Sequence, residues 1–296
     1  MSTDTQAPVV CDWTAIDWSQ HRRFAEVGST RTNVVDIGEG PAVIFLHGLG
    51  GNWQNWLENL PALASDHRCI AVDLPGFGES ALPADSVSVD YYALWVADLV
   101  RTLGLPSATL VGNSMGGQIA AEVALQTPEL VDRLVLVDAA GISVESLKNE
   151  RVVMLLQRAD RLLAFWSTQI VARGWRLATR RRARRTLMSL WVANPDVLRP
   201  GLVTELAKGT GKPGFAAALK SVTSHRIRSR LTAISQPTLI VWGELDRITP
   251  VRDAYEFHAA IRGSRVVVWP DTGHLSMIER AQEFNELLRG FLSRPS

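Results

Sequence analysis

Short runs of β-forming residues that alternate with helical patterns place the strongest constraint on how this chain can fold. The central runs are apolar without interruption, as in "AVIFL", "LVLV" and "TLIVW". Strands buried on both faces of a parallel sheet have this pattern. We therefore predict an α/β fold with helices on both faces of the sheet. The predicted strands lie at 32–37, 42–46, 69–72, 108–111, 134–137, 238–242 and 265–269, and the clearest helices at 91–103, 117–125, 251–261 and 281–292.

One long segment departs from this alternation. Residues 143–229 show helical patterns, many arginines and no convincing strand, which predicts a helical insertion after the sixth strand of the sheet. We accordingly divide the 296 residues into a core of residues 1–142 and 230–296 and a helical cap of residues 143–229. The most apolar part of the insertion, 152–177, is interrupted by charged residues and falls short of the ~18 apolar residues that a membrane span needs.

Charge and cysteine content exclude several classes of protein. The formal net charge is +1, which gives no general attraction to nucleic acid or to a membrane. Cys11 and Cys69 lie far apart and form neither a disulfide framework nor a cluster of metal ligands. The N-terminal stretch "MSTDTQAPVV" has no basic start and no apolar core, so it is unlike a secretory signal. We expect a cytoplasmic protein.

The stretch "TLVGNSMGGQIAAEVAL", residues 109–125, places a serine between an apolar run and a helical pattern. A serine hydroxyl becomes a useful nucleophile when it is exposed and held beside a base. A sharp turn from strand to helix exposes the hydroxyl, and the crowding of that turn requires small flanking residues. Gly112, Ser114 and Gly116 form this G-x-S-x-G pattern, the nucleophile elbow. Ser114 is therefore the predicted nucleophile.

The elbow also predicts an acid and then a histidine, each at the end of a later strand. His274 follows the strand at 265–269, and the glycine before it allows its loop to turn, so His274 is the predicted base. Glu244 and Asp246 follow the strand at 238–242. Asp246 is the predicted acid, since Glu244 comes too soon after the strand. Asp138, at the end of the strand at 134–137, remains the alternative acid.

Backbone N–H groups at two places can bind the oxyanion of an acyl transfer reaction. The elbow supplies the N–H of Met115, and the glycine-rich loop "HGLGG" after the strand at 42–46 supplies the N–H of Leu49. Glycines in this loop let the backbone approach a substrate closely. We expect His47 to brace the loop rather than to transfer protons. The stretch "DLPGFGES", residues 73–80, is expected to form a tight turn at the floor of the site.

These motifs together resemble the α/β-hydrolase family. "HGLGG", "DLPGFGES", "GNSMGG", "GELD" and "TGH" occur in the family's order, and the resemblance covers residues 31–292. It implies a mostly parallel sheet of eight strands with a helical cap after the sixth strand. The elbow residue is Ser114 rather than aspartate, which argues against the haloalkane dehalogenase and epoxide hydrolase branches.

The resemblance implies a serine esterase or lipase-like enzyme that needs no metal or organic cofactor and acts on a small ester with an apolar acyl group. "GNSMGG" is also similar to the C–C bond hydrolases of aromatic-ring degradation. Those enzymes usually have a longer glycine-proline loop and a tryptophan after the catalytic histidine, whereas Leu275 follows His274 here. A C–C bond hydrolase and a ligand-binding member of the fold remain the alternatives.

The cap carries two features that bear on binding. Its apolar residues are expected to pack against the core, with a subset lining an acyl pocket: Leu155, Leu156, Leu162, Leu163, Phe165, Trp166, Trp175 and Trp191. Its arginines form either a solvated helix face, which we favour, or a contact with an anionic surface or substrate. These arginines are Arg176, Arg180, Arg181, Arg182, Arg184 and Arg185.

Overall fold

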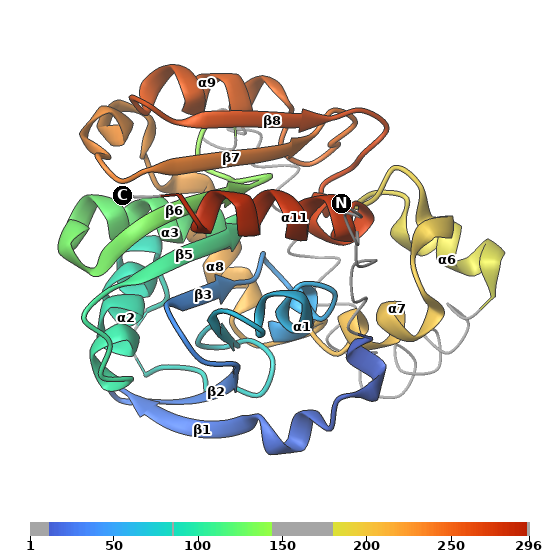
Figure 1. Ribbon diagram of the computed structural model, residues 1–296, viewed down its shortest axis with the longest axis horizontal. Coiled ribbons are helices and arrows are strands. Elements are labelled where there is room, and N and C mark those ends of the chain that lie inside the picture. Colours follow the sequence, from blue (N-terminus) through green and yellow to red (C-terminus); the bar gives the residue numbers. More distant parts are fainter. Residues whose placement is uncertain (1–11, 85, 144–179, 295–296) are drawn as a thin grey trace, which may run out of the picture.

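A single sheet of eight strands organises the computed structural model, which describes residues 12–84, 86–143 and 180–294 (Figure 1). The strand order is β1-β2-β4-β3-β5-β6-β7-β8. β2 is antiparallel to both of its neighbours, and the pairs from β4 to β8 are parallel. The strands are β1 (Arg22–Val27), β2 (Thr30–Ile37), β3 (Ala42–Leu46), β4 (Arg68–Val72), β5 (Ala108–Asn113), β6 (Val131–Val137), β7 (Thr238–Gly243) and β8 (Arg265–Trp269).

Helices cover the sheet on both faces, as predicted. The α-helices are α1 (Leu60–Leu63), α2 (Val89–Thr102), α3 (Met115–Gln126), α6 (Arg181–Met188), α7 (Pro200–Ala207), α8 (Phe215–Ser224), α9 (Arg252–Ala260), α10 (Ser276–Glu279) and α11 (Ala281–Leu292). The described residues also contain short 3-10 helices: η1 (Trp13–Ala15), η2 (Trp18–Gln20), η3 (Trp53–Trp56), η4 (Pro128–Leu130), η8 (Pro195–Val197) and η9 (Arg228–Ala233).

Two apolar clusters fill the space between the sheet and its helices. Successive strand residues point to opposite faces, so Ile44 and Leu46 of β3 join one cluster while Val43 and Phe45 join the other. The first cluster includes residues of α2, α3 and α9. The second includes residues of α1 and α11, which lie together in front of the sheet (Figure 1). This double coverage explains why the central strands are apolar without alternation.

The predicted fold class is confirmed, and one strand escaped prediction. Each predicted strand is present, and β3 and β8 have the predicted bounds. β1 was missed because most of its side chains are exposed, which leaves no apolar run to detect. It pairs with β2 through a turn at Gly28, which has a φ of 58°.

The predicted cap lies partly outside the described residues, since 144–179 are not among them. Trp166, Trp175 and Arg176, together with the predicted apolar residues 155–165, lie outside as well. Of the described residues between β6 and β7, 180–233 form α6, η8, α7, α8 and η9. None of the described helices is long and apolar enough to cross a lipid bilayer.

Candidate active site

Ser114 occupies a strained turn between β5 and α3. Its φ is positive, at 54°, and non-glycine residues rarely adopt a positive φ. The turn is held because Ser114 N–H donates to the Val137 carbonyl at 3.0 Å and the Ser114 carbonyl accepts from Ala140 N–H at 3.0 Å. A Cβ on Gly112 would lie 2.2 Å from the carbonyl oxygen of Gly116. The predicted strand–turn–helix is therefore present, and its crowding explains the glycine at 112.

Gly116 brings the elbow against the loop that follows β3. A Cβ on Gly116 would lie 2.2 Å from the Leu46 carbonyl oxygen, and a Cβ on Gly48 would lie 3.1 Å from Ser114 Cβ. The loop predicted to carry the oxyanion donor thus starts beside the predicted nucleophile. Met115 is the first residue of α3, and the N–H groups of a first helical turn have no partner within their helix.

His47 holds the "HGLGG" loop from inside the protein. Its ring is fully buried, and Nδ1 lies 2.8 Å from the Gly48 carbonyl oxygen while Nε2 accepts from Leu74 N–H at 3.0 Å. The two contacts place the proton on Nδ1. Burial lowers the pKa of the His47 imidazole, which favours this neutral form. The expectation that His47 braces the loop agrees with these contacts.

His274 and Asp246 are in direct contact. Nδ1 of His274 lies 2.7 Å from Oδ2 of Asp246, and both side chains are almost fully buried. Because a carboxylate only accepts hydrogen bonds, the ring proton belongs on Nδ1, which leaves Nε2 able to take a proton. Asp246 also accepts from the backbone N–H groups of Ile248, at 2.7 Å, and Thr249, at 3.0 Å.

Asn113 links the elbow to the loop that carries His274, residues 270–275, which we call the histidine loop. Its amide nitrogen lies 3.2 Å from the carbonyl oxygens of both Val137 and His274. No hydrogen bond joins the Ser114 hydroxyl to His274 within the part of the chain that the structure describes. In serine hydrolases without substrate this contact is often longer than a hydrogen bond.

Asp138, the alternative acid, faces other partners. Its Oδ1 accepts from Gly243 N–H at 2.8 Å, and its Oδ2 accepts from Ser276 N–H at 3.1 Å. Ser276 Oγ lies 2.6 Å from the same Oδ2. Burial, together with the neighbouring Asp246 charge, raises the pKa of the Asp138 carboxyl well above its usual value. The His274 ring therefore has Asp246 rather than Asp138 as its carboxylate partner.

Several supporting residues gave little signal in the sequence. Thr249 lies three residues after Asp246, and its Oγ1 is 2.7 Å from Asp246 Oδ2. A Cβ on Gly243 would lie 2.2 Å from the Gly273 carbonyl oxygen. The backbone at the start of the loop that carries Asp246 (residues 244–251, the acid loop) therefore packs directly against the backbone of the histidine loop, at a glycine on each side. Glycines in "WGELD" and "TGH" are the signal that could have indicated this contact.

Asp73 organises the turn predicted for residues 73–80. Its carboxylate accepts from the N–H groups of Trp53 and Glu79, each at 2.8 Å, and from the side chain of Asn33 at 2.8 Å. A Cβ on Gly78 would lie 2.0 Å from the Asp73 carboxyl carbon. The buried carboxylate therefore fixes the positions of η3 and of this turn beside the "HGLGG" loop.

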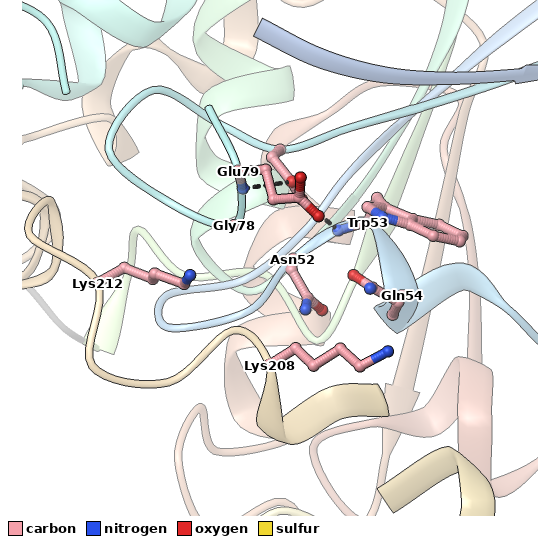
Figure 2. Close-up of a pocket in the computed structure, with 8 residues that line it drawn as sticks. Asn52, Trp53, Gln54, Gly78, Glu79, Lys208 and Lys212 are labelled. Atoms are coloured by element: carbon pink, nitrogen blue, oxygen red, sulfur yellow. Dashed lines mark hydrogen bonds between the residues drawn. The ribbon is translucent and has the colours of Figure 1, made fainter. Parts of the chain in front are cut away.

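A pocket of about 330 Å³, lined mostly by residues with polar or charged side chains, lies next to this arrangement (Figure 2). The loop from α7 to α8 closes one side of the pocket, where Lys208 forms an ion pair with Glu205. Figure 2 shows the Lys212 side chain pointing toward Asn52 across the pocket. Backbone contacts hold this loop in place, since a Cβ on Gly209 would lie 2.8 Å from the Gly50 carbonyl oxygen. The pocket is lined by Asn52, Trp53, Gln54, Asp73, Gly78, Glu79, Lys208 and Lys212.

The arginines of α6 are partly used to hold the helix. Arg181 and Arg185 both pair with Asp196, and buried Arg184 donates to the Pro195 carbonyl at 3.1 Å. These three side chains fasten α6 to η8.

Comparison with known proteins places the chain in a family. Residues 41–281 match the α/β hydrolase fold family. An uncharacterized protein of Mycobacterium tuberculosis is 33% identical over 261 residues, which cover 82% of this chain and 73% of that protein. The chain therefore belongs to the α/β-hydrolase fold family.

Two of the relatives are named as hydrolytic or degrading enzymes. The Pseudomonas putida enzyme 2-hydroxy-6-oxo-2,4-heptadienoate hydrolase is 27% identical over 258 residues, which cover 82% of this chain and 86% of that enzyme. The solved structure of an N-acyl homoserine lactone degrading enzyme has a TM-score of 0.72 at 26% identity and covers 91% of this chain and all of that one. Fold and relatives together support a hydrolase.

Proposed function

We propose that the protein is a serine hydrolase that cleaves carboxylic esters, with Ser114 as nucleophile, His274 as base and Asp246 as the orienting acid. The observation that carries this proposal is the buried 2.7 Å contact between His274 Nδ1 and Asp246 Oδ2. Both residues come later in the chain than the elbow, where Ser114 has a strained backbone. A nucleophile, a base and a group that orients the base are the elements that covalent acyl transfer needs.

In the proposed reaction, Ser114 Oγ attacks the acyl carbonyl carbon while Nε2 of His274 takes the hydroxyl proton. The imidazolium that forms is stabilised by Asp246, and it then gives the proton to the leaving alcohol. Water, deprotonated by the same ring, attacks the acyl-enzyme and releases the acid. The substrate in this proposal is a small ester with an apolar acyl group.

The negative oxygen of each tetrahedral intermediate would be bound by the N–H groups of Met115 and Leu49. Two features support this assignment. Gly48 packs against Ser114, and buried His47 fixes the start of the loop through Gly48 and Leu74. Preorganised donors of this kind stabilise the transition state because they do not reorient during the reaction.

A C–C bond hydrolase is the second candidate, and the Pseudomonas putida relative supports it. Against it stand the short "HGLGG" loop and Leu275 after His274. Leu275 is buried in the apolar cluster that includes α1 and α11. The relative that degrades N-acyl homoserine lactones acts on a molecule that contains a cyclic ester, which supports the first candidate.

Turnover measurements distinguish the two candidates. A series of p-nitrophenyl esters of rising chain length would be assayed beside a ring-fission dienoic acid, with wild-type protein and with Ser114→Ala. We expect the wild type to hydrolyse the esters and the variant to be inactive. Rapid cleavage of the dienoic acid with negligible ester turnover would replace the proposal with the second candidate.

A further inference from the structure

One buried carboxyl group joins the end of β7 to the start of α10, and these two points flank the loops that carry Asp246 and His274. Asp138 follows β6, adopts a φ of 47° and is fully buried. Its Oδ1 accepts from Gly243 N–H, three residues before Asp246, at 2.8 Å. Its Oδ2 contacts both the N–H and the hydroxyl of Ser276, two residues after His274, at 3.1 and 2.6 Å. The two carboxyl oxygens thus hold the last residue of β7, where the loop of Asp246 begins, and the first residue of α10, where the loop of His274 ends.

The backbone of Asp138 reaches the same pair of residues by a second route. Thr249 Oγ1 lies 3.0 Å from the Asp138 carbonyl oxygen, 2.7 Å from Asp246 Oδ2 and 3.2 Å from His274 Nδ1. The Asp138 N–H donates to the Val241 carbonyl at 2.9 Å, which fixes the residue against β7. Asp138 therefore reaches the His274–Asp246 contact through its backbone, by way of Thr249, as well as through its side chain.

We propose that Asp138 is a positioning residue that sets the His274–Asp246 hydrogen bond by fastening the acid loop and the histidine loop to the end of β6. The proposal rests on the proposed serine-hydrolase function for its consequences in catalysis. A carboxyl group suits this task because one rigid, planar group offers an oxygen to each loop. A displacement of the base by about 1 Å lowers the rate even when the fold persists.

The side chain at this position decides which loop is held. Asp138→Asn keeps an oxygen for Gly243 N–H and an amide that can donate to the Ser276 hydroxyl, but it loses the acceptor for Ser276 N–H. Asp138→Ala loses all three contacts. The proposal therefore predicts a graded loss of kcat in which the asparagine variant retains more activity than the alanine variant.

A second buried carboxyl group provides the matched control. Asp253 of α9 is fully buried, and its carboxyl group accepts from the Ser143 N–H at 2.8 Å and from the Ser143 hydroxyl at 2.5 Å. The chemistry of this pair repeats that of Asp138 with Ser276, but neither residue contacts His274 or Asp246 among the described residues. Asp253→Ala should therefore remove stability without moving the base.

The test compares kcat and KM for an ester substrate with thermal stability in Asp138→Ala, Asp138→Asn, Ser276→Ala and Asp253→Ala. We expect Asp138→Ala to lower kcat about 10–100-fold, the range that loss of a hydrogen-bond partner of a metal ligand typically costs, with KM little changed. Asp253→Ala should lower the melting temperature but not kcat. Ser276→Ala and Asp138→Asn remove fewer contacts, so they keep the test possible if Asp138→Ala does not fold.

A readout that does not depend on turnover separates this proposal from the proposed function. The low-field proton resonance of His274 Nδ1–H, assigned by its absence in His274→Gln, should weaken or disappear in Asp138→Ala and persist in Asp253→Ala. If this resonance and kcat are unchanged in folded Asp138→Ala, or if Asp253→Ala loses as much kcat, the positioning role is wrong. If Ser114→Ala keeps full turnover, the proposed function fails, and the resonance alone then decides the role of Asp138.

Discussion

His274 and Asp246 lie 28 residues apart in the chain, yet Nδ1 of the histidine is 2.7 Å from Oδ2 of the aspartate. Adjacent parallel strands make this possible, because β7 and β8 end side by side and release their loops at the same edge of the sheet. A hydrogen bond to a carboxylate fixes the ring's tautomer and its orientation, and in the proposed reaction it leaves Nε2 free to take the proton of the Ser114 hydroxyl.

Asp246→Asn should lower kcat by roughly 10⁴-fold, because the amide favours the wrong tautomer of His274. The matched control is Asp271→Asn in the histidine loop. Asp271 is exposed, and its φ of 51° is one that asparagine adopts readily. Steady-state ester hydrolysis by both folded variants checks the prediction. Equal activity in the two variants would show that Asp246 does not orient the base.

Gly112→Ala should prevent stable folding of the elbow, because the added Cβ would lie 2.2 Å from the Gly116 carbonyl oxygen. Gly290→Ala in α11 serves as the control, since no atom beyond its chain neighbours and the nearby helix backbone lies within 4 Å of its added Cβ. That control should raise the free energy of unfolding by about 0.5–1 kcal/mol, as alanine favours a helix over glycine. Chemical denaturation measures both changes, and a Gly112→Ala variant as stable as wild type would contradict the crowding described.

Glu122 of α3 should make the protein less stable in acid. Burial raises the pKa of this carboxyl, but hydrogen bonds from His225, Arg230 and Gln126 outweigh that effect and lower the pKa from 4.5 to about 2. The folded state therefore binds the proton less well than the unfolded chain does. The stability that the carboxylate supplies is present above pH 4.5 and is lost as the pH falls toward 2.

Chemical denaturation of wild type and Glu122→Gln between neutral pH and pH 2 tests whether the stability supplied by Glu122 is lost in acid. The difference in their free energies of unfolding should be on the order of 3 kcal/mol at neutral pH and should shrink in acid. Glu129→Gln, a change at an exposed glutamate of η4, should show no such difference. A gap between wild type and Glu122→Gln that stays constant with pH would refute the assignment.

The arginines of α6 should not bind the protein to anionic membranes. Arg181 and Arg185 are paired with Asp196, which leaves Arg180 and Arg182 without an ion-pair partner among the described residues. We expect no co-sedimentation with acidic vesicles even at low salt, where screening is weakest. Binding that disappears both in high salt and in the Arg180→Gln, Arg182→Gln double variant would support an anionic surface as partner.

The fold was predictable from the sequence to the extent that burial leaves an apolar pattern. β3, with Val43 and Phe45 on one face and Ile44 and Leu46 on the other, is buried on both faces and was predicted with its bounds. β1 is an edge strand, and Phe24 within it is partly exposed beneath the Arg31 guanidinium. Such a strand depends on pairing with β2, which no local pattern reports.

The residues of the candidate site also differ in how far a local sequence pattern indicates them. Ser114 can be predicted from the sequence because the crowding of the elbow requires glycines at neighbouring positions. The contact of Asp138 with Ser276 joins residues 138 positions apart, and only the assembled sheet brings them together. The choice between Asp246 and Asp138 as partner of His274 likewise depends on where each carboxyl points, which is a property of the fold.

Labelling with a fluorophosphonate probe tests the central claim most directly, because such a probe reacts covalently with a serine that an adjacent base activates. Wild-type protein and Ser114→Ala, each shown to be folded by circular dichroism, would be treated with the probe and analysed by mass spectrometry. The account predicts one adduct on the wild type, located at Ser114, and none on the variant. A wild-type protein that remains unlabelled, or equal labelling of the variant, would contradict it.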